Sequence, residues 1–130
     1  MKSRTILVVD DTVIFRDSMA VALRRQGYDT LLASNGQEAL ELVRAHDPDL
    51  ILLDVAMPVM GGLRCLKELR ADQQFRDIPV IMLTAMSERD AIKAAGQMGI
   101  QEYLLKSQFS LKDMLAQVDE LLQVAVPKRD

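Results

Sequence analysis

Four short runs of this sequence are apolar at every position, and each ends in a residue with a polar or charged side chain. Residues 6–9 run into Asp10 and Asp11, 50–53 into Asp54, 80–83 into Thr84, and 103–105 into Lys106. A strand that is buried on both faces of a parallel sheet is apolar throughout, whereas a strand with one wet face alternates. The pattern therefore predicts four strands of a parallel sheet that is covered on both sides.

Helical patterns separate these runs, and a further short strand is predicted at residues 28–33. Apolar residues at helical spacing predict helices over residues 12–26, 37–45, 63–71 and 111–124, with Ser110 as the cap of the last. A further helix would begin after Ser87 as its N-cap and end between Gly96 and Gly99. Five strands and five helices in strict alternation are typical of βαβ units. The expected fold is a doubly wound α/β sandwich of three layers with right-handed crossovers.

Length and composition predict one globular domain. The 130 residues are 49% hydrophobic and 27% charged, which leaves little room for disorder. A net charge of -3 gives no basic face for nucleic acid. The single Cys65 excludes an internal disulfide, and the longest apolar runs are strand-sized, so neither secretion nor membrane spanning is expected.

The polar residues after the strands predict a site for phosphoryl chemistry. In an open parallel sheet the ligand site lies beyond the carboxyl ends of the strands, so these side chains should meet at one edge. Asp10, Asp11 and Asp54 would form an oxygen-rich pocket for a hard cation such as Mg2+. Lys106 and Thr84 would supply a charge and a hydroxyl to phosphoryl oxygens, and a carboxylate there can attack phosphorus. Each residue alone has an ordinary structural explanation, such as a turn, a cap or a solvated strand end, and only the combination is specific.

These residues stand within the motifs ILVVDD, LILLDVAMPVMGG, VIMLTA and YLLK. With them the chain resembles the receiver domain of two-component response regulators over about residues 4–124. The resemblance implies a flavodoxin-like fold of strand order 2-1-3-4-5, an order for which a receiver protein is a known example. It also implies that residues 1–130 are a single receiver domain, with 125–130 as a tail or the start of a linker.

The same resemblance assigns roles to the site. Asp54 would accept a phosphoryl group from the phosphohistidine of a sensor kinase or phosphotransfer protein, and Asp10, Asp11, Asp54 and the Ala56 carbonyl would hold Mg2+. Lys106 would bind the phosphoryl group. Thr84 would move to meet it, and the Tyr103 ring would then turn inward from solvent.

In this reading the protein is a signalling switch of the bacterial cytoplasm rather than an enzyme, with weak self-phosphorylation and self-dephosphorylation. The surface of the fourth helix, fifth strand and fifth helix would control a protein partner or an attached output domain, without direct contact to nucleic acid or membrane. Phosphorylation-dependent homodimerisation through this face stays open.

The sequence departs from the family pattern in three places, of which one, Gly61-Gly62 instead of the more usual Asp-Gly, is expected to matter little because flexible glycines are acceptable in that loop. Ser107 follows Lys106 where most receivers have proline in a cis bond, and a cis bond to serine would cost about 2.5–4 kcal/mol. We therefore expect a trans bond and a rearranged loop through Gln108-Phe109. Ala56 and Met86 stand where polar side chains often orient the hydrolytic water, so we expect slow dephosphorylation.

Three other functions are weighed against this one. A phosphatase of the haloacid dehalogenase type needs an Asp-x-Asp spacing, which Asp10-Asp11 lacks. A flavin-binding protein of the same fold needs a Ser/Thr/Gly-rich phosphate loop after the first strand. A phosphorylation-independent pseudo-receiver, which only binds partners, remains the alternative because of Ser107. His46 is interpreted as a helix-end residue and Cys65 as a buried apolar one.

Overall fold

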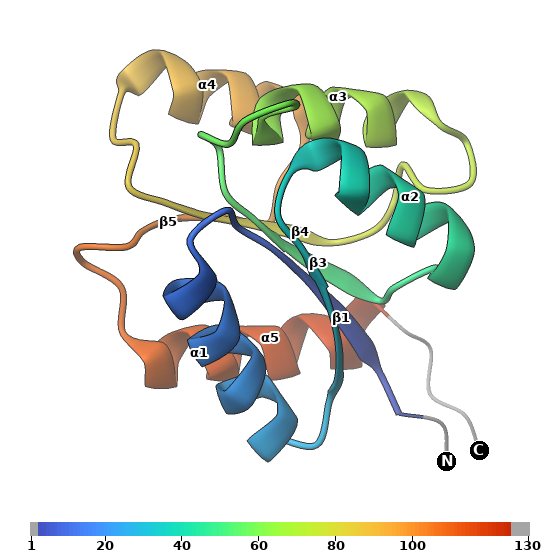
Figure 1. Ribbon diagram of the computed structural model, residues 1–130, viewed down its shortest axis with the longest axis vertical. Coiled ribbons are helices and arrows are strands. Elements are labelled where there is room, and N and C mark those ends of the chain that lie inside the picture. The colour runs from blue at the N-terminus through green and yellow to red at the C-terminus, as the bar shows by residue number, and fades with distance from the viewer. Residues whose placement is uncertain (1–2, 126–130) are drawn as a thin grey trace.

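The computed structural model describes residues 3–125, so the expected tail lies outside the described residues apart from Ala125. Five strands form one parallel sheet of order β2-β1-β3-β4-β5, and five helices alternate with them along the chain (Figure 1). The strands are β1 (Thr5–Val9), β2 (Asp29–Ala33), β3 (Leu50–Leu53), β4 (Val80–Thr84) and β5 (Glu102–Leu105). The helices are α1 (Val13–Arg25), α2 (Gly36–His46), α3 (Gly62–Ala71), α4 (Arg89–Met98) and α5 (Leu111–Ala125). The expected fold class and strand order are confirmed.

The sheet is the middle of three layers. Helices α1 and α5 cover one face, and α2, α3 and α4 cover the other (Figure 1). Successive side chains of a strand point to opposite faces, so each central strand contributes to two cores. Leu7 and Val9 of β1 pack with α2 and α3, whereas Ile6 and Val8 pack with α1 and α5.

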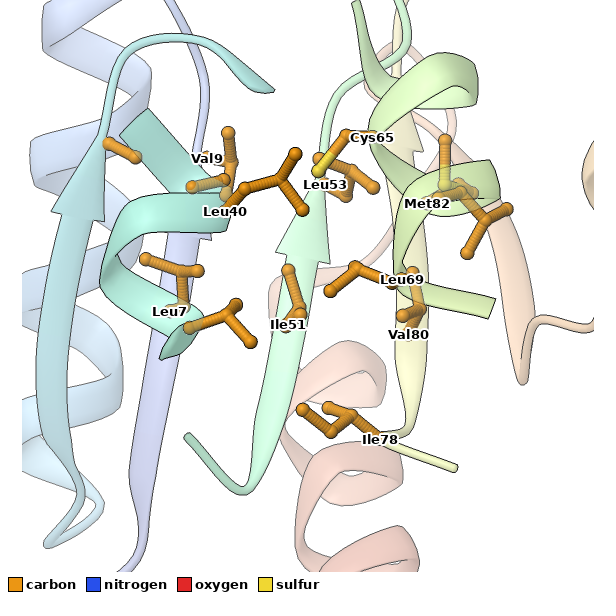
Figure 2. Packing of buried hydrophobic residues seen from close by; sticks show 14 of the residues in the cluster. Leu7, Val9, Leu40, Ile51, Leu53, Cys65, Leu69, Ile78, Val80 and Met82 are labelled. Atoms are coloured by element: carbon orange, nitrogen blue, oxygen red, sulfur yellow. The ribbon is translucent and has the colours of Figure 1, made fainter. Parts of the chain in front are cut away.

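The α2–α3–α4 core is shown in Figure 2, where Leu40, Cys65 and Leu69 of the helices meet Ile51 and Leu53 of β3. All of these side chains are at most 4% exposed. Each fully buried aliphatic side chain stabilises the fold by about 1.5–3 kcal/mol relative to an exposed one. The need to fill both cores explains why the central strands are apolar at every position.

One of the four runs is less buried than its sequence predicts. Strands β3 and β4 are buried at every residue and β1 at all but its first, but every residue of β5 is half-buried. The reason is that β5 is an edge strand, with β4 as its only neighbour. Burial on both faces is therefore confirmed for three runs and wrong for residues 103–105.

Most helix ends lie within two residues of those expected, and α4 shows the clearest error. Its N-cap is Glu88 rather than Ser87, and no side chain caps it. The other end is as expected, because α4 ends at Met98, between Gly96 and Gly99, and Gly99, with φ of 93°, is its C-cap. Ser110 Oγ accepts a hydrogen bond from the Asp113 amide at 3.2 Å, as expected for the cap of α5.

Within residues 3–125, no helix combines the length and apolar character needed to cross a membrane.

Candidate functional site

Strand register brings the polar residues together at one edge of the sheet. Val9 of β1 is paired with Leu53 of β3, so Asp10 and Asp54 follow as neighbours. The Asp54 amide continues this pairing by donating to the Val9 carbonyl at 3.0 Å. In the same way the Lys106 amide donates to the Thr84 carbonyl at 2.8 Å, which carries the β4–β5 pairing one residue further.

Three carboxylates form an acidic pocket at this edge. Asp10, Asp11 and Asp54 each offer an oxygen, and these oxygens lie within 4.8 Å of one another. Asp10 is 2% exposed and Asp54 5%, whereas Asp11 is exposed. The Oδ1 atom of Asp54 is buried and has no hydrogen-bond partner among the described residues. A buried carboxylate oxygen without a donor is costly, and a hard cation with oxygen ligands would satisfy it. The donor set therefore fits Mg2+.

Lys106 is the cation that faces this pocket. Its Nζ lies 2.7 Å from Asp10 Oδ2 and 3.3 Å from Asp54 Oδ2. Burial alone lowers the pKa of Lys106, but the hydrogen bond to Asp10 and the negative charges of Asp54 and Asp10 together raise it above its usual value. The side chain therefore stays positively charged at neutral pH, next to the atoms where a phosphoryl group would bind.

Two aromatic side chains that were not expected to belong to the site lie here, Phe15 next to Lys106 and Phe109 next to Phe15. Lys106 Nζ lies 4.4 Å from the centre of the Phe15 ring. Phe15 in turn makes an edge-to-face contact with Phe109, with ring centres 6.1 Å apart and planes at 70°. Phe15 falls on the apolar stripe of α1, so its sequence position looks like that of any core residue.

Thr84 and Tyr103 are linked by hydrogen bonds to the backbone of Met86. Thr84 is fully buried, and its Oγ1 accepts a hydrogen bond from the Met86 amide at 3.2 Å. The Tyr103 hydroxyl donates to the Met86 carbonyl at 2.8 Å. Burial, followed by the charges of Asp54 and Glu88, raises the pKa of Tyr103. Tyr103 is half-buried here, with its ring packed against the α2–α3–α4 core.

Gly62, expected as the last residue of the loop after β3, is the first residue of α3 and lies against the backbone of Asp54. A Cβ atom on Gly62 would lie 1.9 Å from the Asp54 carbonyl oxygen. The Gly62 amide also donates to the Val55 carbonyl at 2.8 Å. Gly62 thus lets the start of α3 pack directly against the backbone of Asp54. In the same loop Val59 has φ of 67°, an unusual value for a branched side chain.

The remaining selected residues are placed as follows. Ala56 is exposed in the loop after Asp54, and Met86 is half-buried. No peptide bond within the described part of the chain is cis, which confirms the trans bond between Lys106 and Ser107. Cys65 is buried on α3, where burial and the charge of Glu68 raise its pKa to about 12. His46 is the exposed last residue of α2, as expected.

Comparison with known proteins gives a consistent result. The family profile of the response regulator receiver domain matches residues 6–119. The phosphate regulon transcriptional regulatory protein PhoB of Pseudomonas aeruginosa is 38% identical over 127 residues, which are 98% of this chain and 55% of PhoB. The transcriptional regulatory protein PdtaR of Mycobacterium tuberculosis is 36% identical over 117 residues, which are 89% of this chain and 55% of PdtaR. The chain thus spans about half the length of these curated relatives.

Solved structures share the fold over nearly the whole chain. A CheY-like receiver domain protein from Methanospirillum hungatei matches with a TM-score of 0.88 and 24% identity, over 95% of this chain and 97% of that one. At that identity the likeness supports the fold alone. The chemotaxis response regulator CheY4 of Vibrio cholerae matches with a TM-score of 0.83 and 28% identity, over 92% of this chain and 99% of that one.

Proposed function

The chain belongs to the response regulator receiver domain family of two-component systems, and on that premise we propose that Asp54 is its phosphoacceptor. The observation that supports this choice is the meeting of buried Asp54 with Asp10, Asp11 and the Lys106 ammonium at the carboxyl edge of the sheet. Phosphorylation-dependent switching is the general role of the family. The proposal adds which residues of this chain perform it.

The reaction is the transfer of a phosphoryl group from a phosphohistidine to an Asp54 carboxylate oxygen. The new oxygen–phosphorus bond forms as the phosphorus–nitrogen bond of the donor breaks. The electron pair of the broken bond stays on the imidazole nitrogen, which then takes a proton from solvent. Lys106 lies 3.3 Å from Asp54 Oδ2 and would pair with the negative oxygens of the phosphoryl group.

Asp10, Asp11, Asp54 and the Ala56 carbonyl would hold Mg2+, which neutralises charge on the carboxylates and the transferred group. Because Asp10 Oδ1 accepts the Thr12 amide at 2.9 Å and Oδ2 accepts Lys106, its carboxylate is already held in one orientation. The Asp10 carboxylate therefore needs little reorientation to serve as a ligand.

The switch that we propose runs from Thr84 to Tyr103. A phosphoryl group on Asp54 would draw the Thr84 hydroxyl toward it and remove the acceptor of the Met86 amide. The Met86 carbonyl, which holds the Tyr103 hydroxyl, belongs to the same segment. A movement at Thr84 would thereby change the surface of α4, β5 and α5, where we expect a protein partner or an attached output domain to bind.

The lifetime of the phosphorylated state follows from Ala56 and Met86. The methyl group of Ala56 and the thioether of Met86 provide no strong hydrogen bond to orient a water molecule for attack on the acyl phosphate. We therefore expect the phosphorylated protein to persist for many minutes at neutral pH without a phosphatase. A half-life of seconds would contradict this part of the proposal.

We further propose that residues 1–130 form one regulatory receiver domain, acting in the bacterial cytoplasm with a histidine kinase or phosphotransfer protein as donor. Its net charge of -3 does not favour contact of this domain with nucleic acid. The named relatives are transcriptional regulatory proteins.

The experiment is intact-mass measurement after incubation with Mg2+ and a small acyl-phosphate or phosphoramidate donor. We expect a gain of one phosphoryl group that disappears with EDTA and with Asp54→Asn. Asp77→Asn on the exposed segment before β4 is a matched control and should be phosphorylated like the wild type. No gain with any donor would refute the proposal and favour a receiver that binds partners without phosphorylation.

A further inference from the structure

The Lys106 ammonium contacts two carboxylates and one aromatic ring. Asp10 and Asp54 take two of its hydrogen-bond directions. The Phe15 ring covers a third direction, with its centre 4.4 Å from Nζ. A cation over an aromatic face is attracted by the negative charge density of the ring, most strongly when water is excluded. The side chain of Lys106 is only 19% exposed, so water reaches this contact from few directions.

The contact matters because little else restrains Lys106. A lysine side chain has four flexible methylene groups and a strongly hydrated head, which favours solvent over a pocket. The residue that follows is Ser107, exposed and joined by a trans bond, rather than a proline whose ring would restrict the backbone. The loop is closed instead by the Gln108 and Phe109 amides, which both donate to the Leu105 carbonyl at 2.9 Å.

That closure places Phe109 against Phe15. Their edge-to-face geometry is a favourable arrangement for aromatic pairs and fixes the plane of the Phe15 ring. Both rings also pack on the α1–α5 core, so the pair is anchored on a rigid base. The β5–α5 loop and helix α1 thus meet at the ring that faces the ammonium.

We propose that Phe15 is a positioning residue for phosphoryl transfer, because its ring, braced by Phe109, holds the Lys106 ammonium between Asp10 and Asp54. This inference rests on the function proposed above and adds two residues that act through Lys106 rather than on the phosphoryl group. The role predicts that removal of the ring slows transfer only while Lys106 is present.

The first experiment is a double-mutant cycle on the initial rate of phosphorylation, with saturating Mg2+ and a small acyl-phosphate donor. Phe15→Leu keeps an apolar side chain but removes the ring, and we expect the rate to fall about three- to tenfold, within the range of partly desolvated cation–π contacts. Phe15→Tyr keeps the ring and should restore most of the rate. In a Lys106→Met background, Phe15→Leu should cause no further loss.

Phe75→Leu is the matched control. Phe75 is 4% exposed and packs in the α2–α3–α4 core, so its replacement removes an aromatic ring on the other side of the sheet. It should lower stability without slowing phosphorylation. Equal slowing by Phe75→Leu and Phe15→Leu would mean that stability, not positioning, explains the effect and would overturn the inference.

The second experiment measures the position of Lys106 without any chemistry. In protein labelled with carbon-13 lysine, the ε-methylene signal of Lys106, identified by its absence in Lys106→Met, should show a ring-current shift. The shift should vanish in Phe15→Leu and remain in Phe15→Tyr.

The two readouts separate the possible failures. An unshifted signal in the wild type, or a Phe15→Leu effect that persists without Lys106, would overturn the positioning role. A shifted signal in a protein that no donor phosphorylates would instead refute the proposed function and leave the aromatic contact as a structural feature.

Discussion

Replacement of Gly62 by alanine should destabilise the protein strongly, although alanine is the better helix former. Gly62 is the first residue of α3, and a Cβ atom there would lie 1.9 Å from the Asp54 carbonyl oxygen and 2.8 Å from the Asp54 carbonyl carbon. Close carbon–oxygen contacts in proteins are about 3.3–3.6 Å. The start of α3 and the end of β3 must therefore separate by about 1.5 Å.

The magnitude follows from two losses. Overpacking of a tight backbone contact costs about 1–3 kcal/mol. Separation also breaks the 2.8 Å hydrogen bond from the Gly62 amide to the Val55 carbonyl, and a buried group left unpaired costs about 1–3 kcal/mol. We expect a loss of about 3 kcal/mol or more in the free energy of unfolding. With an m-value of about 2 kcal/mol per M, the urea midpoint should fall by about 1.5 M.

The assay is urea unfolding followed by circular dichroism, with Gly96→Ala as the matched control. Gly96 lies inside α4, and a Cβ atom there would meet nothing within 4 Å. Alanine should stabilise that helix by about 0.5–1 kcal/mol. The same substitution in two helices should thus shift the midpoint in opposite directions. A Gly62→Ala protein as stable as the wild type would refute the argument that α3 packs directly on the backbone of Asp54.

Three more changes test other parts of the structure. Val59→Asn should stabilise the protein by about 1 kcal/mol in urea unfolding, because asparagine tolerates the φ of 67° better than a branched side chain; an unchanged midpoint would argue against strain there. Burial and the neighbouring Glu68 carboxylate raise the pKa of Cys65 to about 12. Between about pH 9 and 12 the thiol is therefore ionised in the unfolded chain but neutral in the folded protein, so the free energy of unfolding should fall in that window. Cys65→Ala should lack this decline when melts are compared at pH 7 and 10, and parallel declines would contradict the assignment. Lys106→Met should bind Mg2+ about tenfold more tightly by calorimetry, because it removes a positive charge 2.7 Å from Asp10; weaker binding would mean that Lys106 does not compete with the cation.

The carboxyl-edge residues could be predicted from the sequence because each follows directly from a strand. Because Val9 pairs with Leu53 in the sheet, Asp10 and Asp54, which follow them directly, must be neighbours. A side chain one residue past the end of a buried parallel strand has its position determined by the sheet alone. The same reasoning placed Lys106 beside Thr84.

Contacts that depend on the packing of loops and helices could not be predicted in this way. Phe15 reads as one more apolar position of α1, and only the path of the β5–α5 loop brings Phe109 and Lys106 to it. Gly62 looks like a flexible loop residue until α3 is seen to start against Asp54. The predicted start of α4 was also wrong. Serine is a common N-cap residue, but the helix begins at Arg89, two residues after Ser87, with Glu88 as its N-cap.

The most direct test of the central claim is to locate the phosphoryl group chemically. After reaction with Mg2+ and a small acyl-phosphate donor, borohydride reduction converts an aspartyl phosphate to homoserine, and peptide mass spectrometry then identifies the position. The account predicts homoserine at Asp54, in Mg2+-dependent amounts and nowhere else. Homoserine at Asp10 or Asp11, or its absence although the intact mass had increased, would contradict the assignment of Asp54 as the phosphoacceptor.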